Sequence, residues 1–161
     1  LVVYARVDGS FAVWDPANPM LAGAANVSRW RGLKFTREEI WDGKKGQIEG
    51  LISDWTKWQL RPDRYPAFST FQAVLRRISP PDIGPMIIGE PVRIPGDTRE
   101  IPTLVHPYDS VPIFFESAGI RRIITLAYLL VWAWEEHKVQ ARQQGRPEER
   151  QMVVLIDEAE G

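Results

Sequence analysis

The stretch "MVVLIDEAEG", residues 152–161, joins a short apolar run directly to acidic side chains. The run Val153–Ile156 is rich in β-branched residues, which predicts a strand covered on both faces, as in a parallel sheet. In open α/β sheets, ligands bind just beyond the carboxyl ends of the strands. Because Asp157 and Glu158 follow the run at once, we expect this strand end to hold a metal ion or to orient a water molecule.

Composition and charge describe a folded domain without an extreme character. The chain has 161 residues, and 44% of them are hydrophobic, which is enough for one domain with a real core. The net charge of −1 provides no global field for nucleic acid or an anionic membrane. The absence of cysteine excludes disulfides and thiolate chemistry and is compatible with the reducing cytoplasm, where we expect the protein. The apolar run at residues 123–134 is shorter than the roughly 18 residues of a membrane span, so it predicts a core helix and no membrane partner.

The hydrophobic pattern predicts a single mixed α/β (α+β) domain made of three sections. Residues 1–46 form an antiparallel β section, in which Asp8 and Gly9 give a strong hairpin signal. Residues 47–80 form a helical lobe, because apolar residues recur there every three or four positions. Residues 81–161 contain short strands at 90–94, 101–106 and 111–115, a long helix from Ser117 to about Gln144, a polar loop and the final strand.

A second informative stretch is "FFESAGIRRIITLAYLLVWAWEEH", residues 114–137. A turn of small residues leads from a strand into the long helix, whose first N–H groups are unpaired and can receive a phosphate. Arg121 and Arg122 occupy the first turn, where each cation costs about 0.3–1 kcal/mol unless an anion offsets it. The simpler alternative, which a short motif taken alone favours, is an ordinary N-cap by Ser117 with the arginines paired to Glu116 or solvent.

Together, "ESAGIRRIITLAYLLVW" and "VVLIDEAE" resemble the signature helix and the Walker B strand of ABC-type ATPase heads, in particular bacterial AAA-family ATPases of the SMC-like and OLD-like group. Ser117 and Gly119 match the serine and the second glycine of the signature, and Asp157 and Glu158 match the Walker B pair. The order of elements along the chain also agrees with such a head. The resemblance is specific for residues 111–161 and loose for the rest.

The sequence departs from the family pattern at two points. The signature's usual Leu, first Gly and Gln appear as Glu116, Ala118 and Ile120. No phosphate loop of the form GxxxxGK followed by Ser or Thr is present, and "DGKKGQ" at residues 42–47 reads as a turn. The resemblance therefore implies an interior part of a larger ATPase, without its Walker A motif and without the segments after Walker B. This part alone is expected neither to bind ATP tightly nor to hydrolyse it.

The resemblance also implies roles at the strand end. Asp157 would hold Mg²⁺ through a water, and Glu158 would polarise the water that attacks ATP. In such a head, Val153–Ile156 is a buried interior strand beside the strand that leads to Ser117, joined to it by a right-handed crossover.

The resemblance also implies a role for the start of the long helix. Ser117 and Gly119 would bind the γ-phosphate of an ATP molecule that a second subunit holds. Arg121 and Arg122 add positive charge there. The implied partners are a second ATPase subunit in a homodimer, and DNA or a nuclease or effector. Two alternatives stay open: a non-catalytic mixed α/β binding or interaction domain, and a degenerate head that binds nucleotide and switches partners without turnover.

Overall fold

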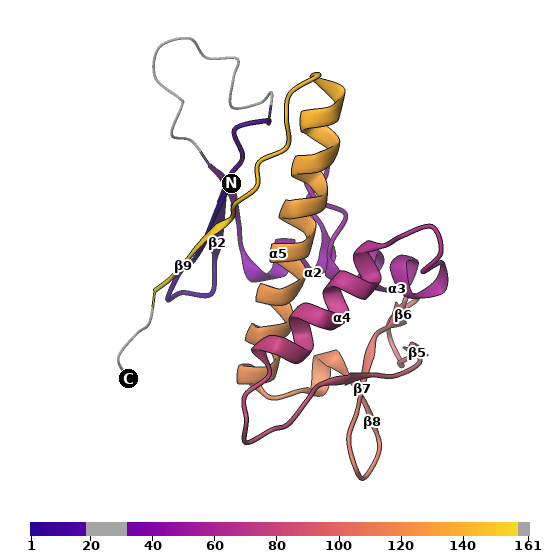
Figure 1. The fold of residues 1–161 in the computed structure, drawn as a ribbon. Coiled ribbons are helices and arrows are strands. Elements are labelled where there is room, and N and C mark those ends of the chain that lie inside the picture. The colour runs from indigo at the N-terminus through magenta and orange to yellow at the C-terminus, as the bar shows by residue number, and fades with distance from the viewer. Residues whose placement is uncertain (19–31, 158–161) are drawn as a thin grey trace. The chain divides into compact units, whose positions relative to one another are not determined.

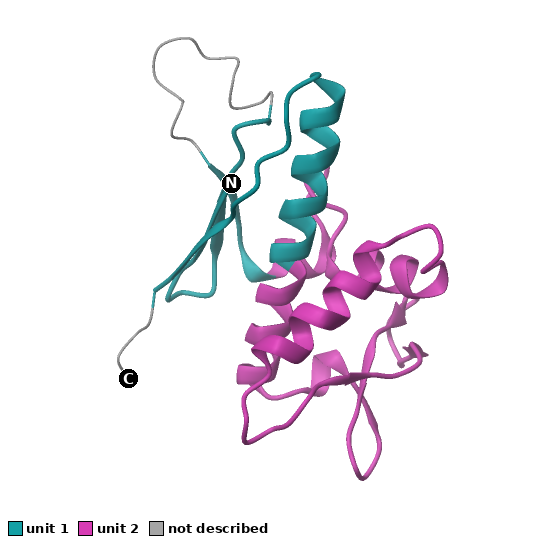
Figure 2. Ribbon diagram, viewed as in Figure 1, with its two compact units in different colours: residues 1–37, 129–161 teal, residues 38–128 magenta. Residues whose placement is uncertain are grey.

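The computed structural model describes residues 1–18 and 32–157 and has a mixed α/β architecture, which confirms the coarse fold class (Figure 1). The chain divides into two compact units (Figure 2). Unit 1 comprises residues 1–37 and 129–161, and unit 2 comprises residues 38–128. The boundary between them passes through the long helix α5 (Ala118–Gln143). Unit 1 contains one sheet, and unit 2 contains two small sheets.

Unit 1 is built on a four-stranded sheet with the order β3-β2-β1-β9. Its strands are β1 (Val2–Ala5), β2 (Phe11–Trp14), β3 (Leu33–Phe35) and β9 (Val153–Ile156). β1 and β2 form the predicted antiparallel hairpin, in which Gly9 has a φ of 80°, a conformation that suits glycine. β9 pairs with β1 in parallel, so the antiparallel section becomes a mixed sheet.

One face of this sheet packs on α5. Successive side chains of a strand point to opposite faces, and the face that carries Val3, Phe11 and Phe35 is buried. The ring of Phe35 meets Trp132 of α5 edge-on, with the ring centroids 5.6 Å apart. The unit 1 part of α5 is therefore the helical layer of this core.

β9 differs from its predicted place. Val153–Ile156 is a strand, as expected, but its side chains are 37% to 52% exposed, so the predicted burial is wrong. The strand lies at the end of the sheet order, and β1 is its one neighbour among the strands of residues 1–18 and 32–157. The strand that precedes Ser117, β8 (Ser110–Pro112), belongs to a different sheet in unit 2, so the predicted interior position beside it is also wrong. An apolar run indicates a strand, but its burial depends on neighbours that the run itself does not supply.

Unit 2 contains the helical lobe. α3 (Leu51–Leu60) and α4 (Ala67–Ile78) confirm the helical pattern of residues 47–78, with a break between them. Trp55 of α3 and Phe71 of α4 are fully buried and lie edge-on, with centroids 4.7 Å apart. A further short helix, α2 (Arg37–Asp42), was not predicted; it buries Ile40 and Trp41.

The remaining strands of unit 2 are short and form two small sheets, β4-β7-β8 and β5-β6. They are β4 (Ile87–Ile88), β5 (Val92–Arg93), β6 (Glu100–Ile101) and β7 (Thr103–Val105) together with β8. Pro102 divides the predicted strand at 101–106 into β6 and β7. The predicted strand at 111–115 is wrong in its second half, because Ile113–Phe115 forms a 3-10 turn that leads towards α5.

The segment "DGKKGQ" forms a compact turn, as predicted from the absence of a phosphate-loop pattern. Lys44 and Ile48 pair across it, and the Lys44 N–H donates to the Ile48 carbonyl at 2.8 Å. Gly43 and Gly50 have φ values of 97° and 101°. A Cβ added at Gly43 would lie 2.6 Å from the Glu49 carbonyl oxygen. Backbone here approaches backbone more closely than any side chain allows.

Substitutions at these glycines test the close approach. Gly43→Ala should lower the free energy of unfolding by more than about 3 kcal/mol. The backbone at Glu49 must move away from the added Cβ, and the alanine must also adopt a strained positive φ. Gly46→Ala is the matched control: φ is 76° there, but nothing lies within 4 Å of the added Cβ. The control should show only the conformational cost of roughly 1–2 kcal/mol. Urea denaturation followed by tryptophan fluorescence measures both, and equal losses would contradict the close approach.

Candidate functional site

Asp157 follows β9 and lies at the carboxyl end of the parallel pair β1 and β9. Its N–H donates to the Ala5 carbonyl at 2.8 Å, which extends the parallel ladder by one residue. The Asp157 side chain is exposed, and its Oδ2 accepts a hydrogen bond from the Tyr4 hydroxyl at 3.3 Å. A carboxylate thus lies beyond the carboxyl ends of two parallel strands, the position where ligands of open α/β sheets bind.

The predicted partner of Asp157, Glu158, lies outside the described residues. Within residues 1–18 and 32–157, no group of three or more His, Asp or Glu side chains comes together to enclose a metal ion. Mg²⁺ in nucleotide sites keeps several waters and takes one or two carboxylates together with phosphate oxygens. The exposed carboxylate of Asp157 is an oxygen donor of the kind that fits such a water-mediated contact.

The start of α5 is capped by the residue that the sequence indicated. The Ser117 Oγ accepts a hydrogen bond from the Ile120 N–H at 3.3 Å, so the ordinary N-cap role of Ser117 is confirmed. A Cβ added at Gly119 would meet nothing within 4 Å, so the backbone of the first turn borders open space at this residue. Room exists there for a group that approaches the helix start.

The two arginines of this first turn differ. Arg121 is partly buried, and its Nε, which is fully buried, has no hydrogen-bond partner among the described residues. Arg122 is exposed and does interact with other groups. The Glu116 carboxylate, one predicted partner of the arginines, contacts Nε2 of His106 at 2.6 Å. One oxygen of Glu116 is therefore engaged by an imidazole, a contact that the sequence did not indicate.

The predicted site residues fall into two groups. Ser117, Gly119, Arg121 and Arg122 lie together at the start of α5 in unit 2, whereas Asp157 belongs to unit 1. Tyr4, which lies beside Asp157, is not indicated by the sequence. An isolated tyrosine in a strand gives no signal of this kind, because the parallel register of β1 and β9 is needed to bring the two side chains together.

A buried chain of hydrogen bonds fixes the start of α5 and was also not foreseen. The Trp41 indole N–H of α2 donates to the Thr125 hydroxyl at 2.7 Å, and that hydroxyl donates to the Arg121 carbonyl at 2.7 Å. Phe114 lies against Trp41, with ring centroids 5.6 Å apart. α2 therefore orients the first turns of the helix that carries the signature-like residues.

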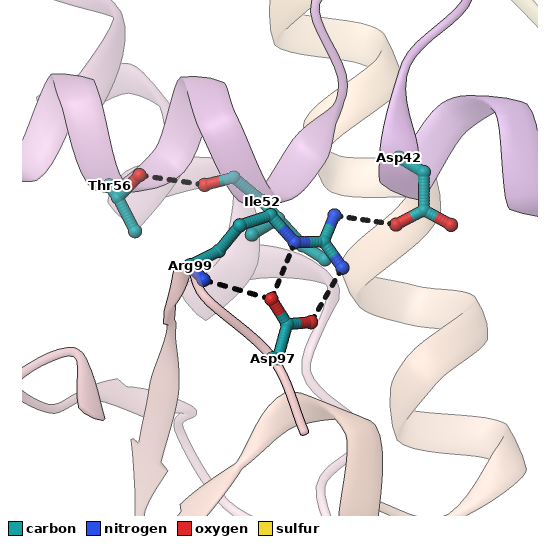
Figure 3. A network of polar contacts seen from close by, with 5 residues as sticks. All are labelled: Asp42, Ile52, Thr56, Asp97 and Arg99. Atoms are coloured by element: carbon teal, nitrogen blue, oxygen red, sulfur yellow. Dashed lines mark hydrogen bonds and ion pairs between the residues drawn. The ribbon is translucent and has the colours of Figure 1, made fainter. Parts of the chain in front are cut away.

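A second polar cluster of unit 2 joins Arg99, Asp97 and Asp42 (Figure 3). Arg99 Nε and Nη2 donate to the two carboxylate oxygens of Asp97 at 3.0 and 2.8 Å, and Nη1 donates to Asp42 at 2.7 Å. Hydrogen bonding from Arg99 lowers the pKa of Asp97 to about 2. All three guanidinium nitrogens donate a hydrogen bond, so the cluster ties the segment before β6 to the end of α2.

Tyr128 of α5 is fully buried and donates its hydroxyl proton to Asp54 of α3 at 2.8 Å. Lys57 contacts the other oxygen of the same carboxylate at 2.8 Å. Burial, and after it the negative charge of Asp54, raises the pKa of Tyr128 well above its ordinary value of 10.0. The phenol therefore keeps its proton in the folded state under conditions that ionise it in the unfolded chain.

A pH dependence follows from this shift. A raised folded-state pKa gives stability that is full below pH 10.0 and is lost as the pH rises through the folded pKa. Tyr128→Phe should remove that alkaline loss, and at neutral pH it should lower the free energy of unfolding by about 1–2 kcal/mol, because Asp54 loses a buried donor. The measurement is urea denaturation between pH 8 and 11, a range that spans the ordinary pKa of tyrosine, about 10. The exposed Tyr108→Phe is the control; an equally steep alkaline loss in Tyr128→Phe would contradict the assignment.

Comparison with protein-family models, with curated proteins and with solved structures finds no match for this chain. Among the described residues, no helix is both long and apolar enough to cross a membrane.

Proposed function

We propose that this chain is part of an ABC-type ATPase head that binds and hydrolyses ATP and dimerises around it. The observation that supports it best is the place of Asp157, exposed at the carboxyl end of β9 and hydrogen-bonded through its N–H to the parallel neighbour β1. A carboxylate at this point of a parallel pair is where a nucleotide-binding sheet presents its acidic groups to a ligand.

In this proposal, Asp157 and Glu158 have different roles. The Asp157 carboxylate holds a hydrated Mg²⁺ through a water, and the neighbouring Glu158 accepts a proton from the attacking water. The bound cation, when present, offsets the negative charge of the phosphate oxygens. Such a general base accounts for roughly 10²–10⁴-fold in rate.

The start of α5 contributes the second half of the proposed site. The positive end of this 26-residue helix and the open space at Gly119 suit a phosphate of ATP bound by a second subunit. The partly buried Arg121 adds positive charge, and Ser117 organises the turn. The arrangement across a dimer comes from the family resemblance alone.

The proposal requires a phosphate loop from outside these 161 residues, because the sequence contains none. It places the protein in the cytoplasm, with a second ATPase subunit as its first partner. We further propose that the ATP cycle drives action on DNA or on a nuclease or effector.

A binding experiment tests the proposal. In the protein as the cell makes it, a fluorescent ATP analogue should bind more tightly with Mg²⁺ than without it, and Asp157→Ala should remove most of that difference. Asp82→Ala, at an exposed acid of unit 2, is the control and should bind as the parent does. The 161-residue chain alone should bind the analogue only weakly. Tight stoichiometric binding by this chain alone, or no effect of Asp157→Ala, would overturn the assignment and favour a non-catalytic binding domain.

A further inference from the structure

The register of the parallel pair β1 and β9 places a tyrosine of β1 next to Asp157. Tyr4 of β1 is paired with Leu155 of β9. Asp157 lies two residues beyond Leu155 and on the same face of the sheet, because side chains alternate along a strand. Two residues advance a strand by roughly 6.6 Å, a distance that a tyrosine side chain leaning along the strand can span. The hydroxyl accordingly reaches Oδ2 of Asp157 at 3.3 Å.

The tyrosine is fixed at its own base. β1 is an interior strand, with β2 on one side and β9 on the other, and the flanking Val3 and Ala5 are 0% and 3% exposed. The Tyr4 side chain is half-buried, whereas the Asp157 side chain is exposed. A half-buried group of an interior strand therefore donates a hydrogen bond to an exposed carboxylate, which restricts the orientations open to that carboxylate.

We infer that Tyr4 is a positioning residue for Asp157, which orients the carboxylate for a hydrated divalent cation. The inference rests on the proposed function. Carboxylates that bind metals are commonly held by such outer hydrogen bonds, and loss of one typically costs 10–100-fold in metal affinity. The Tyr4 bond is made by a neutral group at an exposed site, so we expect a loss near the lower limit, about tenfold. In this role the hydroxyl acts through Asp157 and not by contact with the cation.

The test uses Mn²⁺ as the probe, together with a non-hydrolysable ATP analogue and the protein as the cell makes it. Mn²⁺ binding is followed by electron paramagnetic resonance for Tyr4→Phe, Asp157→Asn and the double variant. Tyr4→Phe should weaken Mn²⁺ binding about tenfold and leave metal-free nucleotide binding unchanged. In the Asp157→Asn background, Tyr4→Phe should have no further effect, since the orienting bond then has no carboxylate to act on. Tyr108→Phe, at a tyrosine 79% exposed, should bind Mn²⁺ as the parent does.

The outcomes separate the inference from the proposed function. If Asp157→Asn weakens Mn²⁺ binding but Tyr4→Phe does not, the positioning role is wrong and the proposed function stands. If Tyr4→Phe weakens Mn²⁺ binding equally with and without the Asp157 carboxylate, the tyrosine acts only through the stability of the sheet and the inference is overturned. If Asp157→Asn itself has no effect, the metal assignment fails and the inference fails with it.

Discussion

Replacing Glu158 with glutamine should lower ATP turnover by roughly 10²–10⁴-fold in the protein as the cell makes it, while ATP binding persists. The amide keeps the size of the side chain but cannot accept a proton from the attacking water. Because the phosphate contacts and the metal site are retained, ATP should accumulate unhydrolysed and trap the dimer. Steady-state phosphate release and equilibrium binding of ATP give the two quantities.

Two further variants serve as comparisons for Glu158→Gln. Glu100→Gln, at an exposed acid of β6, should hydrolyse ATP at the parental rate. Asp157→Ala should lose Mg²⁺-dependent binding in addition to turnover, because it removes the cation contact. If Glu158→Gln hydrolyses ATP as fast as the parent, Glu158 is not the general base.

Gly119→Asp should abolish ATP-dependent dimerisation without unfolding the protein. The proposed γ-phosphate would meet a carboxylate, whose bulk and like charge oppose it. The structure supports an intact fold for this variant: a Cβ at Gly119 meets nothing within 4 Å, and an acidic residue in the first turn of a helix is stabilising by about 0.3–1 kcal/mol. The variant should therefore bind ATP as a monomer.

Light scattering after size-exclusion chromatography, with and without ATP, measures this effect. Gly119→Ala fills the same open space without charge and should dimerise almost as the parent does, and thermal denaturation should show both variants folded. If Gly119→Asp dimerises at the same ATP concentrations as the parent protein, residues 117–120 are not a signature motif. Most of the support for an ABC-type head is then lost.

Local patterns predicted much of the fold. The hairpin at Asp8 and Gly9, the two helices of the lobe and the full length of α5 follow from turn chemistry and from a 3.6-residue period, both of which are properties of neighbouring residues. The apolar run before Asp157 likewise predicted β9 as a strand. Its exposure at the sheet edge did not follow, because burial is decided by the elements that lie alongside.

Contacts between distant residues account for what the sequence could not reveal. Nδ1 of the buried His137 lies 2.7 Å from a carboxylate oxygen of Asp15, and its Nε2 accepts a hydrogen bond from the Glu149 N–H at 2.8 Å. These two contacts join α5 to the turn after β2 and to the polar loop before β9. Asp15 and Glu149 lie 122 and 12 residues from His137 in the chain, so no local pattern indicates either contact.

The site was predictable in the same uneven way. Asp157 and Ser117 stand out from their neighbours as a strand end and a helix start, and the structure describes them as such. Tyr4 and the Trp41 to Thr125 hydrogen bond could not be predicted, because each depends on a register or a packing contact between elements far apart in the chain.

Mixing two inactive variants tests the composite site most directly. Subunits with Gly119→Asp and subunits with Glu158→Gln should each be nearly inactive alone, since one lacks the phosphate contact and the other lacks the base. A mixed dimer retains one complete pairing, in which Gly119 of one subunit faces the ATP beside Glu158 of the other. We predict that ATP hydrolysis returns in part when the two variants are combined. A mixture that hydrolyses ATP no faster than either variant alone would contradict an active site shared between two subunits.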